Sequence, residues 1–140
     1  MQTKPAASVL LSHVDVRVRD RTAARLFYDG LLAPLGATRH DGHEFTTYQI
    51  VPDDMKSDEN YESDDWFGLT QDANMRPNTN RIAFAASSRA IVDRVAEILP
   101  AIGAREIEGP DDAYGPDYYA VFFADPDGNP LEVCYIGDAR

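Results

Sequence analysis

Two side chains that could do chemistry stand at equivalent positions of a pattern that the sequence contains twice. His13 opens an alternating apolar and polar stretch, and Arg81 opens a second such stretch 68 residues later. A helical apolar pattern follows each stretch and ends near a glycine. An imidazole can ligate a metal ion or move a proton, whereas a guanidinium is a permanent cation that clamps oxyanions. The duplication predicts two similar halves with a site between them.

Glu132 is the third candidate, because strand alternation turns its carboxylate away from the apolar side of its own segment. It lies between Leu131 and Val133, which both point to the opposite face. A carboxylate on a largely buried sheet needs a partner. That partner could be a cationic ligand, a metal ion or Arg81, and we favour an ion pair or shared hydrogen-bond network with Arg81.

Three further residues are candidate ligand-binding groups. Asp15 shares a strand face with His13, opposite a row of valines. Cys134 shares the Glu132 face, and the sequence pairs it with no base that would make it a nucleophile. Two adjacent tyrosines point to opposite faces of their strand, and we expect Tyr119 to line the cleft.

The first half reads as a strand, a helix and three strands. Asp20 is the expected helix N-cap, and Pro34 and Gly36 mark the helix end. The acidic segment 52–65 has no clean period and is expected to be an exposed loop. The expected strands of this half cover 8–18, 37–43, 45–51 and 66–71.

The second half repeats this order after a linker over 72–79. A helix capped by Ser87 or Ser88 is expected to run to Gly103. Segment 109–117, rich in Gly, Pro and Asp, is expected to be a loop. The expected strands of this half cover 81–86, 104–108, 118–124 and 131–136.

Length and composition favour one domain over 1–140, made of modules at about 8–71 and 79–137. The formal net charge of −11 argues against nucleic acid and anionic membranes as partners. A single cysteine excludes an intramolecular disulfide. With no apolar signal core and no apolar run long enough to span a bilayer, a cytoplasmic location is expected.

Three segments resemble the vicinal-oxygen-chelate superfamily of glyoxalase I, extradiol dioxygenases and bleomycin-resistance proteins. They are His13-Val-Asp-Val-Arg-Val-Arg-Asp20 with its helix, Arg81-Ile-Ala-Phe-Ala, and the segment from Tyr118 to Glu132 that contains Asp-Pro-Asp-Gly-Asn-Pro-Leu-Glu. The resemblance implies an α+β fold of two βαβββ modules forming a curled mixed sheet around a cleft. It also implies a homodimer, with the cleft inside one chain or across two.

Metal enzymes of this superfamily place one ligand on the first strand and one on the last strand of each module. The matching positions are His13, Gly68, Arg81 and Glu132. Glycine has no side chain and arginine is a cation, so the resemblance implies at most one divalent metal ion, on His13 and Glu132. It implies that His13, Arg81 and Glu132 are the catalytic residues.

The main hypothesis is that the protein binds or converts a small organic molecule in the cleft between modules, with a degenerate metal site. A bleomycin-resistance-like binder is one version, because cationic ligands suit an acidic cleft. The alternative is a divalent-metal-dependent lyase or isomerase of glyoxalase type, or an extradiol-type dioxygenase, using His13 and Glu132. A third hypothesis is an interaction module with a vestigial cleft. Fold alone does not decide among them.

Overall fold

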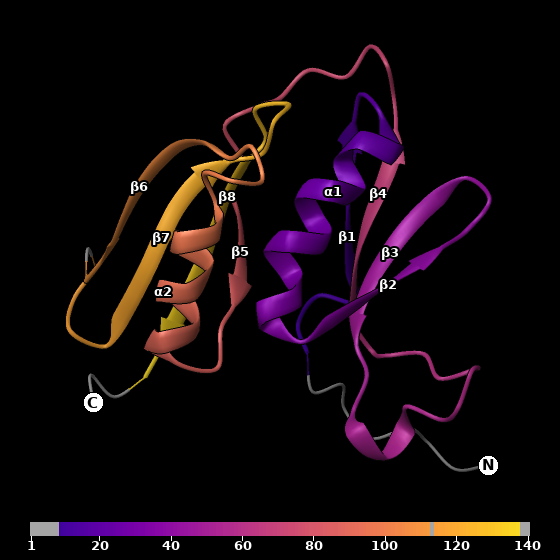
Figure 1. Cartoon of the computed structure of the whole chain (residues 1–140), viewed down its shortest axis with the longest axis horizontal. Helices are drawn as coiled ribbons and strands as arrows, with labels where there is room; N and C mark the ends of the chain where they lie inside the picture. The colour runs from indigo at the N-terminus through magenta and orange to yellow at the C-terminus, as the bar shows by residue number, and fades with distance from the viewer. Residues whose placement is uncertain (1–8, 113, 138–140) are drawn as a thin grey trace.

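The computed structural model describes residues 9–112 and 114–137 and contains two βαβββ modules (Figure 1). Short 3-10 turns at Ala33–Leu35 and Asp53–Met55 complete the order of elements. The predicted α+β fold is therefore confirmed. Module 1 consists of β1 (His13–Val18), α1 (Arg21–Leu32), β2 (Ala37–Asp41), β3 (Phe45–Ile50) and β4 (Trp66–Gln71). Module 2 consists of β5 (Ile82–Ala85), α2 (Arg89–Ile98), β6 (Arg105–Asp111), β7 (Tyr118–Ala124) and β8 (Pro130–Ile136).

Each module forms its own four-stranded sheet, and the two sheets have the same topology. The strand orders are β1-β4-β3-β2 and β5-β8-β7-β6. The first and last strands of each module pair in parallel, and the other pairs are antiparallel. Within residues 9–112 and 114–137, the edge strands β1 and β5 therefore each have one unpaired side, and no strand pairing joins the two sheets.

Both helices begin at the predicted caps. The Asp20 carboxylate accepts a hydrogen bond from the Ala23 N–H at 3.0 Å, and the Ser88 hydroxyl oxygen accepts one from the Ile91 N–H at 3.2 Å. These bonds satisfy backbone donors that have no partner inside the helix. In the described part of the chain, no helix is long and apolar enough to cross a membrane.

The second helix is shorter than the sequence pattern predicts. It ends at Ile98, whereas the apolar period continues toward Gly103. Pro100 explains the difference, because proline lacks the N–H that would continue the helical hydrogen bonds beyond Leu99.

The predicted loop 109–117 was wrong at its start, because β6 continues to Asp111. The strand keeps its pairing with β7 through two register shifts. Gly109 has φ +93°, and a Cβ on it would lie 3.0 Å from the Ala120 carbonyl oxygen. Glycine at this point therefore allows a bulged strand where the sequence is typical of a loop.

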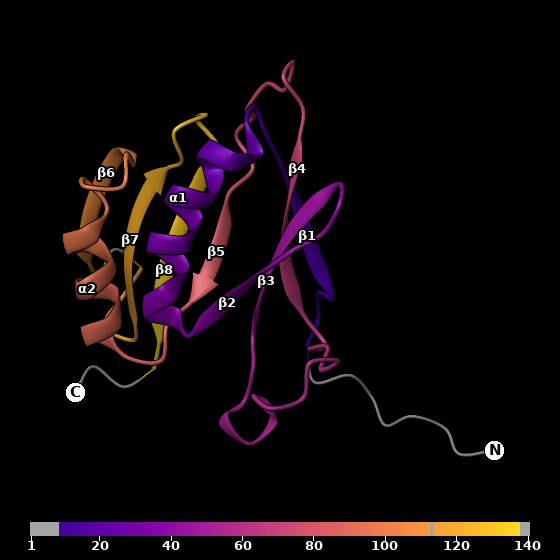
Figure 2. The ribbon, with the colours of Figure 1, turned by 45° about the vertical axis from the view of Figure 1, so that its right-hand side comes forward.

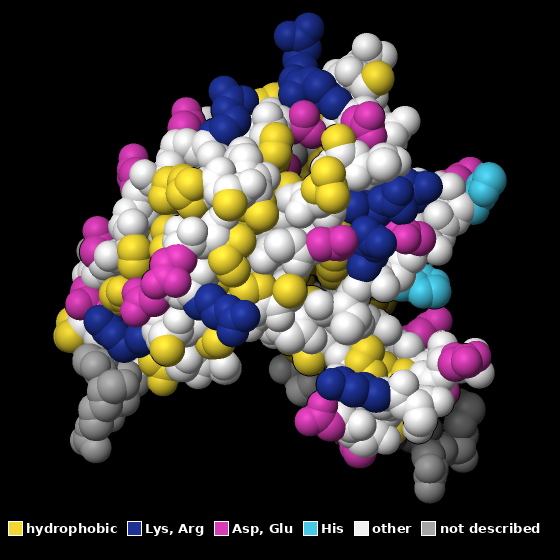
Figure 3. Space-filling model, in the orientation of Figure 1, with side chains coloured by type: hydrophobic (Ala, Val, Ile, Leu, Met, Phe, Trp, Pro, Cys, Tyr) yellow, Lys and Arg dark blue, Asp and Glu magenta, His cyan; other side chains and the backbone are white. Residues whose placement is uncertain are grey.

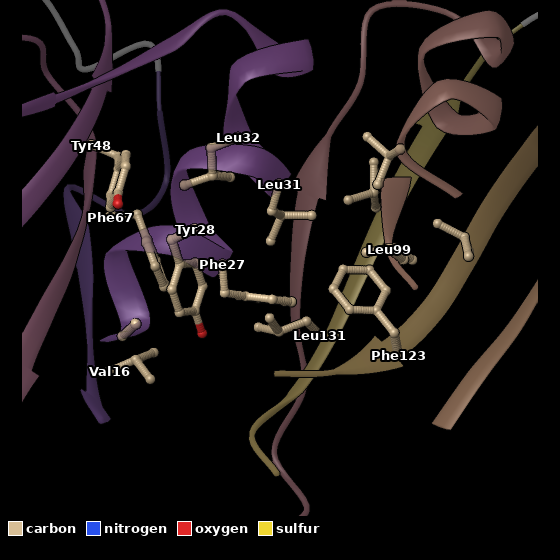
Figure 4. Packing of buried hydrophobic residues seen from close by; sticks show 14 of the residues in the cluster. Val16, Phe27, Tyr28, Leu31, Leu32, Tyr48, Phe67, Leu99, Phe123 and Leu131 are labelled. Carbon is tan, nitrogen blue, oxygen red and sulfur yellow. The ribbon is translucent and has the colours of Figure 1, made fainter. Parts of the chain in front are cut away.

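Helix α1 lies between the two sheets in Figure 1, and in the turned view of Figure 2 it overlaps β8 of module 2. Its side chains contribute to a single apolar core with both modules (Figure 4). The ring centroids of Phe27 and Phe123 are 6.4 Å apart, and those of Phe67 and Phe84 are 4.9 Å apart in an edge-on arrangement. The shared core fixes which sheet faces are covered and which face outward.

A buried hydrogen bond also connects the modules. The Tyr28 hydroxyl donates to the Asp125 carboxylate at 2.6 Å, and the two residues are 0% and 1% exposed. At the surface, the Arg19 guanidinium donates to the Asp127 carboxylate at 3.1 Å. The Asp125–Pro130 connection between β7 and β8 therefore also holds module 2 against α1.

Candidate ligand-binding site

Each sheet has an inner face, covered by the shared core, and an outer face that carries the candidate polar groups. On β1, Val16 and Val18 are buried in the core, whereas His13 and Asp15 are exposed on the other side. The sequence alternation predicted this division, and the structure confirms it.

Module 2 shows the same division with a more enclosed outer face. Leu131 and Val133 are 0% exposed and belong to the shared core. Glu132 is 5% exposed on the opposite face, and Cys134 packs there in a small separate cluster. The two outer faces lie on opposite sides of one core, so His13 and Glu132 do not come together within a chain.

His13 forms a flat aromatic surface on the outer face of module 1. Its ring stacks on Trp66 with centroids 4.3 Å apart and an interplanar angle of 2°. Its Nδ1 lies 3.1 Å from the Ser12 hydroxyl oxygen. Trp66 is 37% exposed, so the stacked pair offers a platform on which a planar ligand can lie.

Each module has one carboxylate at this position of its sheet. In module 1 it comes from the first strand, and in module 2 it comes from the last strand. Asp15 pairs with Gly68 in module 1, and Ala83 pairs with Glu132 in module 2. A Cβ on Gly68 would lie 3.0 Å from Asp15 Oδ1, so the Asp15 carboxylate lies over the glycine. The Thr70 hydroxyl, 2.9 Å away, donates to that carboxylate. Asp15 therefore fills the space that a side chain at position 68 would take.

Glu132 is held by a tyrosine that the sequence analysis did not select. The Tyr118 hydroxyl donates a hydrogen bond to Glu132 Oε2. Burial, together with this bond, raises the pKa of Tyr118 well above its usual range. Burial also raises the pKa of the Cys134 thiol. Tyr118 therefore acts as a donor, and Cys134 is not an activated nucleophile.

The expected ion pair between Arg81 and Glu132 was wrong for a single chain. The Arg81 guanidinium lies over the Phe122 ring, 4.8 Å from its centroid. In the part of the chain that the structure describes, no ion pair joins Arg81 to Glu132. Tyr118 hydrogen-bonds to the Glu132 carboxylate, and the Arg81 guanidinium lies over the Phe122 ring. Glu132 and Arg81 therefore have different partners.

Tyr119 lies on the other face of β7, against α2. Its hydroxyl donates to Asp93, and the Arg89 guanidinium lies 4.0 Å from its ring centroid. The Asp93 bond and burial raise the pKa of Tyr119 to about 12. The structure therefore places Tyr118, rather than the expected Tyr119, beside Glu132.

A cavity of about 430 Å³ lies between the modules, at the free edges of β1 and β5. Figure 3 shows the molecule hollowed between its two halves. His13 and Arg81, the equivalent residues of the repeat, both line this cavity. Its volume is typical of a small-molecule pocket. Much of the wall is apolar and includes Leu11, Leu32, Leu35, Tyr48, Ile50, Trp66, Phe67 and Phe84.

The donor set in one chain does not fit a metal centre. Among residues 9–112 and 114–137, no three His, Cys, Asp or Glu side chains gather closely enough to hold an ion. Of the four implied ligand positions, Gly68 has no donor atom and Arg81 is a cation. His13 and Glu132, the remaining two, face opposite sides of the core.

Comparison with known proteins agrees with the fold. The family model described as Glyoxalase/Bleomycin resistance protein/Dioxygenase superfamily matches residues 10–133. No curated protein is significantly similar in sequence. A glyoxalase/bleomycin resistance protein from Albidiferax ferrireducens T118 is 26% identical, with a TM-score of 0.72 over 91% of this chain and 98% of that one.

Two more distant structures share the fold. A glyoxalase/bleomycin resistance protein/dioxygenase family enzyme from Burkholderia phytofirmans PsJN is 16% identical, with a TM-score of 0.66 over 89% of this chain and 97% of that one. The fosfomycin resistance protein FosX from Listeria monocytogenes is 18% identical, with a TM-score of 0.65 over 92% and 94% of the respective chains.

Proposed function

Because this chain belongs to the Glyoxalase/Bleomycin resistance protein/Dioxygenase superfamily, we propose that it binds or converts a small organic molecule in a cleft formed by two copies. The outer face of module 1 in one copy is one wall, and the outer face of module 2 in the other copy is the second wall. The observation that supports this most is the placement of His13 and Glu132 on opposite sides of one core. A second copy is the simplest way to bring both into one site.

The free edges of β1 and β5 support the same arrangement. Unpaired edges are normally covered in native proteins. Around the cavity between them, Leu11 is 63% exposed, Ile50 55% and Trp66 37%. A two-fold symmetric dimer would bury this apolar rim and the edges of β1 and β5 in both copies.

In such a cleft each side chain has a distinct task. The stacked His13 and Trp66 hold a planar group, and the imidazole can give or take a proton. On the other wall, the Arg81 guanidinium lies over Phe122 and marks where a positive group is favoured. The partner's Glu132, oriented by Tyr118, accepts a hydrogen bond or faces a positive charge.

A metal-dependent enzyme is the alternative to this proposal, and an experiment has to distinguish the two. In the paired arrangement, His13 and the partner's Glu132 supply two donors, and Asp15 lies over Gly68 on the His13 side. Elemental analysis of the purified protein and of its Glu132→Ala variant decides this point. We expect no stoichiometric divalent metal in either protein, and metal that is lost in Glu132→Ala would replace our proposal with the metal-dependent enzyme.

Sedimentation velocity tests the pairing itself. We expect a species of twice the 15.5 kDa chain mass. Replacing Leu11 and Ile50 with Glu should place charge on the buried rim and yield a folded monomer. Leu26→Glu is the matched control, since Leu26 is 78% exposed on α1 and does not line the cavity. A monomeric wild-type chain would contradict the proposal and would leave the cavity of His13 and Arg81 as the ligand site.

A further inference from the structure

A row of three side chains crosses the outer face of module 2. Glu108 pairs with Phe122, and Phe122 pairs with Glu132, across β6, β7 and β8. Residues directly opposite in antiparallel strands place their side chains on the same face. The Phe122 ring is therefore flanked by one carboxylate on each side.

A cation of the chain itself already lies on this ring. The Arg81 guanidinium is 4.8 Å from the Phe122 centroid. Within residues 9–112 and 114–137, no ion pair joins Arg81 to a carboxylate. The guanidinium is thus placed by the negative face of the ring and by the surrounding field. Its position indicates where a positive group is favoured on this surface.

Within residues 9–112 and 114–137, Glu132 forms no ion pair. It is 5% exposed, and its hydrogen bond comes from the neutral phenol of Tyr118. A nearly buried carboxylate is stabilised far more by a nearby positive charge than by a neutral donor. The chain's own cation, Arg81, lies on the neighbouring Phe122 ring and forms no ion pair with Glu132 in the described residues.

A groove at the Glu108 and Phe122 end of this row has the size and charge for a molecule that carries a positive charge. It is an open groove of about 560 Å³ and is lined by Arg81, Glu106, Ile107, Glu108 and Phe122, among others. The acidic groups therefore outnumber the single cation. Tyr114 adds aromatic surface, since its ring meets the Tyr118 and Phe122 rings edge-on at 5.1 Å and 6.0 Å.

We propose that this groove binds an organic cation, a protonated amine or quaternary ammonium with an apolar body, whose charge replaces the Arg81 guanidinium over Phe122. The inference rests on the proposed function, because the groove is one wall of the proposed cleft. It specifies the chemical class of the ligand. The positive charge lies between Glu108 and Glu132, and the apolar body packs against Ile107 and the aromatic rings.

Calorimetric titration with benzyltrimethylammonium tests the proposal, with benzenesulfonate as the anionic probe of matched shape. We expect the ammonium to bind and the sulfonate not to bind. Glu108→Gln should weaken binding several-fold and Phe122→Leu at least tenfold. Arg81→Ala should strengthen binding several-fold, because the competing cation is gone. Glu97→Gln is the control, since it removes the same charge from an exposed position on α2.

Preferred binding of the sulfonate, or loss of ammonium binding in Arg81→Ala, would overturn the proposal. Glu108 is exposed, so Glu108→Gln keeps the test informative even if Phe122→Leu does not fold. A dimer with no Phe122-dependent ammonium binding rejects this inference and leaves the pairing intact. A monomer that binds the ammonium through Phe122 rejects the pairing and leaves this inference intact.

Discussion

Removing one hydroxyl between the modules should measurably lower the stability of the protein. Tyr28 donates to Asp125 at 2.6 Å, in a part of the core where the two residues are 0% and 1% exposed. The substitution Tyr28→Phe keeps the ring and its packing against Phe67 and Tyr48. It deletes only the hydrogen bond that connects α1 to the turn between β7 and β8.

The expected loss follows from what Asp125 retains. Its carboxylate still accepts from the Asp127 N–H at 2.9 Å, the Asn129 N–H at 2.9 Å and Asn129 Nδ2 at 2.8 Å. The charge stays partly satisfied, so the cost is that of one hydrogen bond to a charged group, about 2 kcal/mol in the free energy of unfolding. For a chain of this size, the midpoint of thermal unfolding should fall by about 6 °C.

Urea titration measures the free energy of unfolding, and calorimetry measures the midpoint of thermal unfolding. Tyr61→Phe is the matched control, because the hydrogen bonds of Tyr61 in the described part of the chain use its backbone. In an Asp125→Asn background, Tyr28→Phe should lower the free energy of unfolding by less, because the effects of substitutions at contacting residues are not additive. A loss below about 0.5 kcal/mol in the wild-type background would refute the reasoning, since it is less than one ordinary hydrogen bond contributes.

Three further predictions concern local features. Gly68→Ala should lower the free energy of unfolding by about 1 kcal/mol, because the new Cβ would crowd the Asp15 carboxylate 3.0 Å away. Urea titration should show that this loss disappears in an Asp15→Ala background. An equal loss in both backgrounds would contradict the contact. Asp20→Ala and Ser88→Ala should each cost about 1 kcal/mol by calorimetry, because each removes a helix cap; unchanged stability would argue against the caps. Burial raises the pKa of Tyr28, Tyr48 and Tyr118 in the folded protein. The stability that these phenols contribute is thus complete below about pH 10 and decreases above it as unfolded tyrosines ionise; urea titrations with no such alkaline decrease would contradict the buried phenols.

Local sequence patterns predicted most of the elements, because each depends on neighbouring residues. The alternation around His13 and around Glu132 correctly assigned the inner and outer faces. Side-chain chemistry alone predicted Asp20 as a cap and Ser87 or Ser88 as the other, and the structure has Ser88. The misplaced end of α2 and the start of the 109–117 segment involved a proline and a bulged glycine, where local signals compete with strand pairing.

The site required information that alternation does not contain. Which faces meet is decided by α1, which packs between the sheets (Figure 1) and forms a shared core with both, so that His13 and Glu132 lie on the faces turned away from this core. The partners of Glu132 could have been found from the hairpin register. A turn centred on Asp127 pairs Phe122 with Glu132 and places Tyr118 on the same face. The position of Arg81 over Phe122 depends on a long flexible side chain, which no strand pattern specifies.

Cross-linking between copies tests the central claim most directly. One chain carries His13→Cys and the other Ala83→Cys, both with Cys134→Ser, and the two are co-expressed and treated with a short bismaleimide. Ala83 is exposed beside Glu132 on the outer face of module 2. We expect a covalent heterodimer on a denaturing gel, because the His13 face of one copy meets the Glu132 face of the other. If the two chains stay uncoupled, and the two substitutions in one chain give only an internal link, the cleft is not formed between copies.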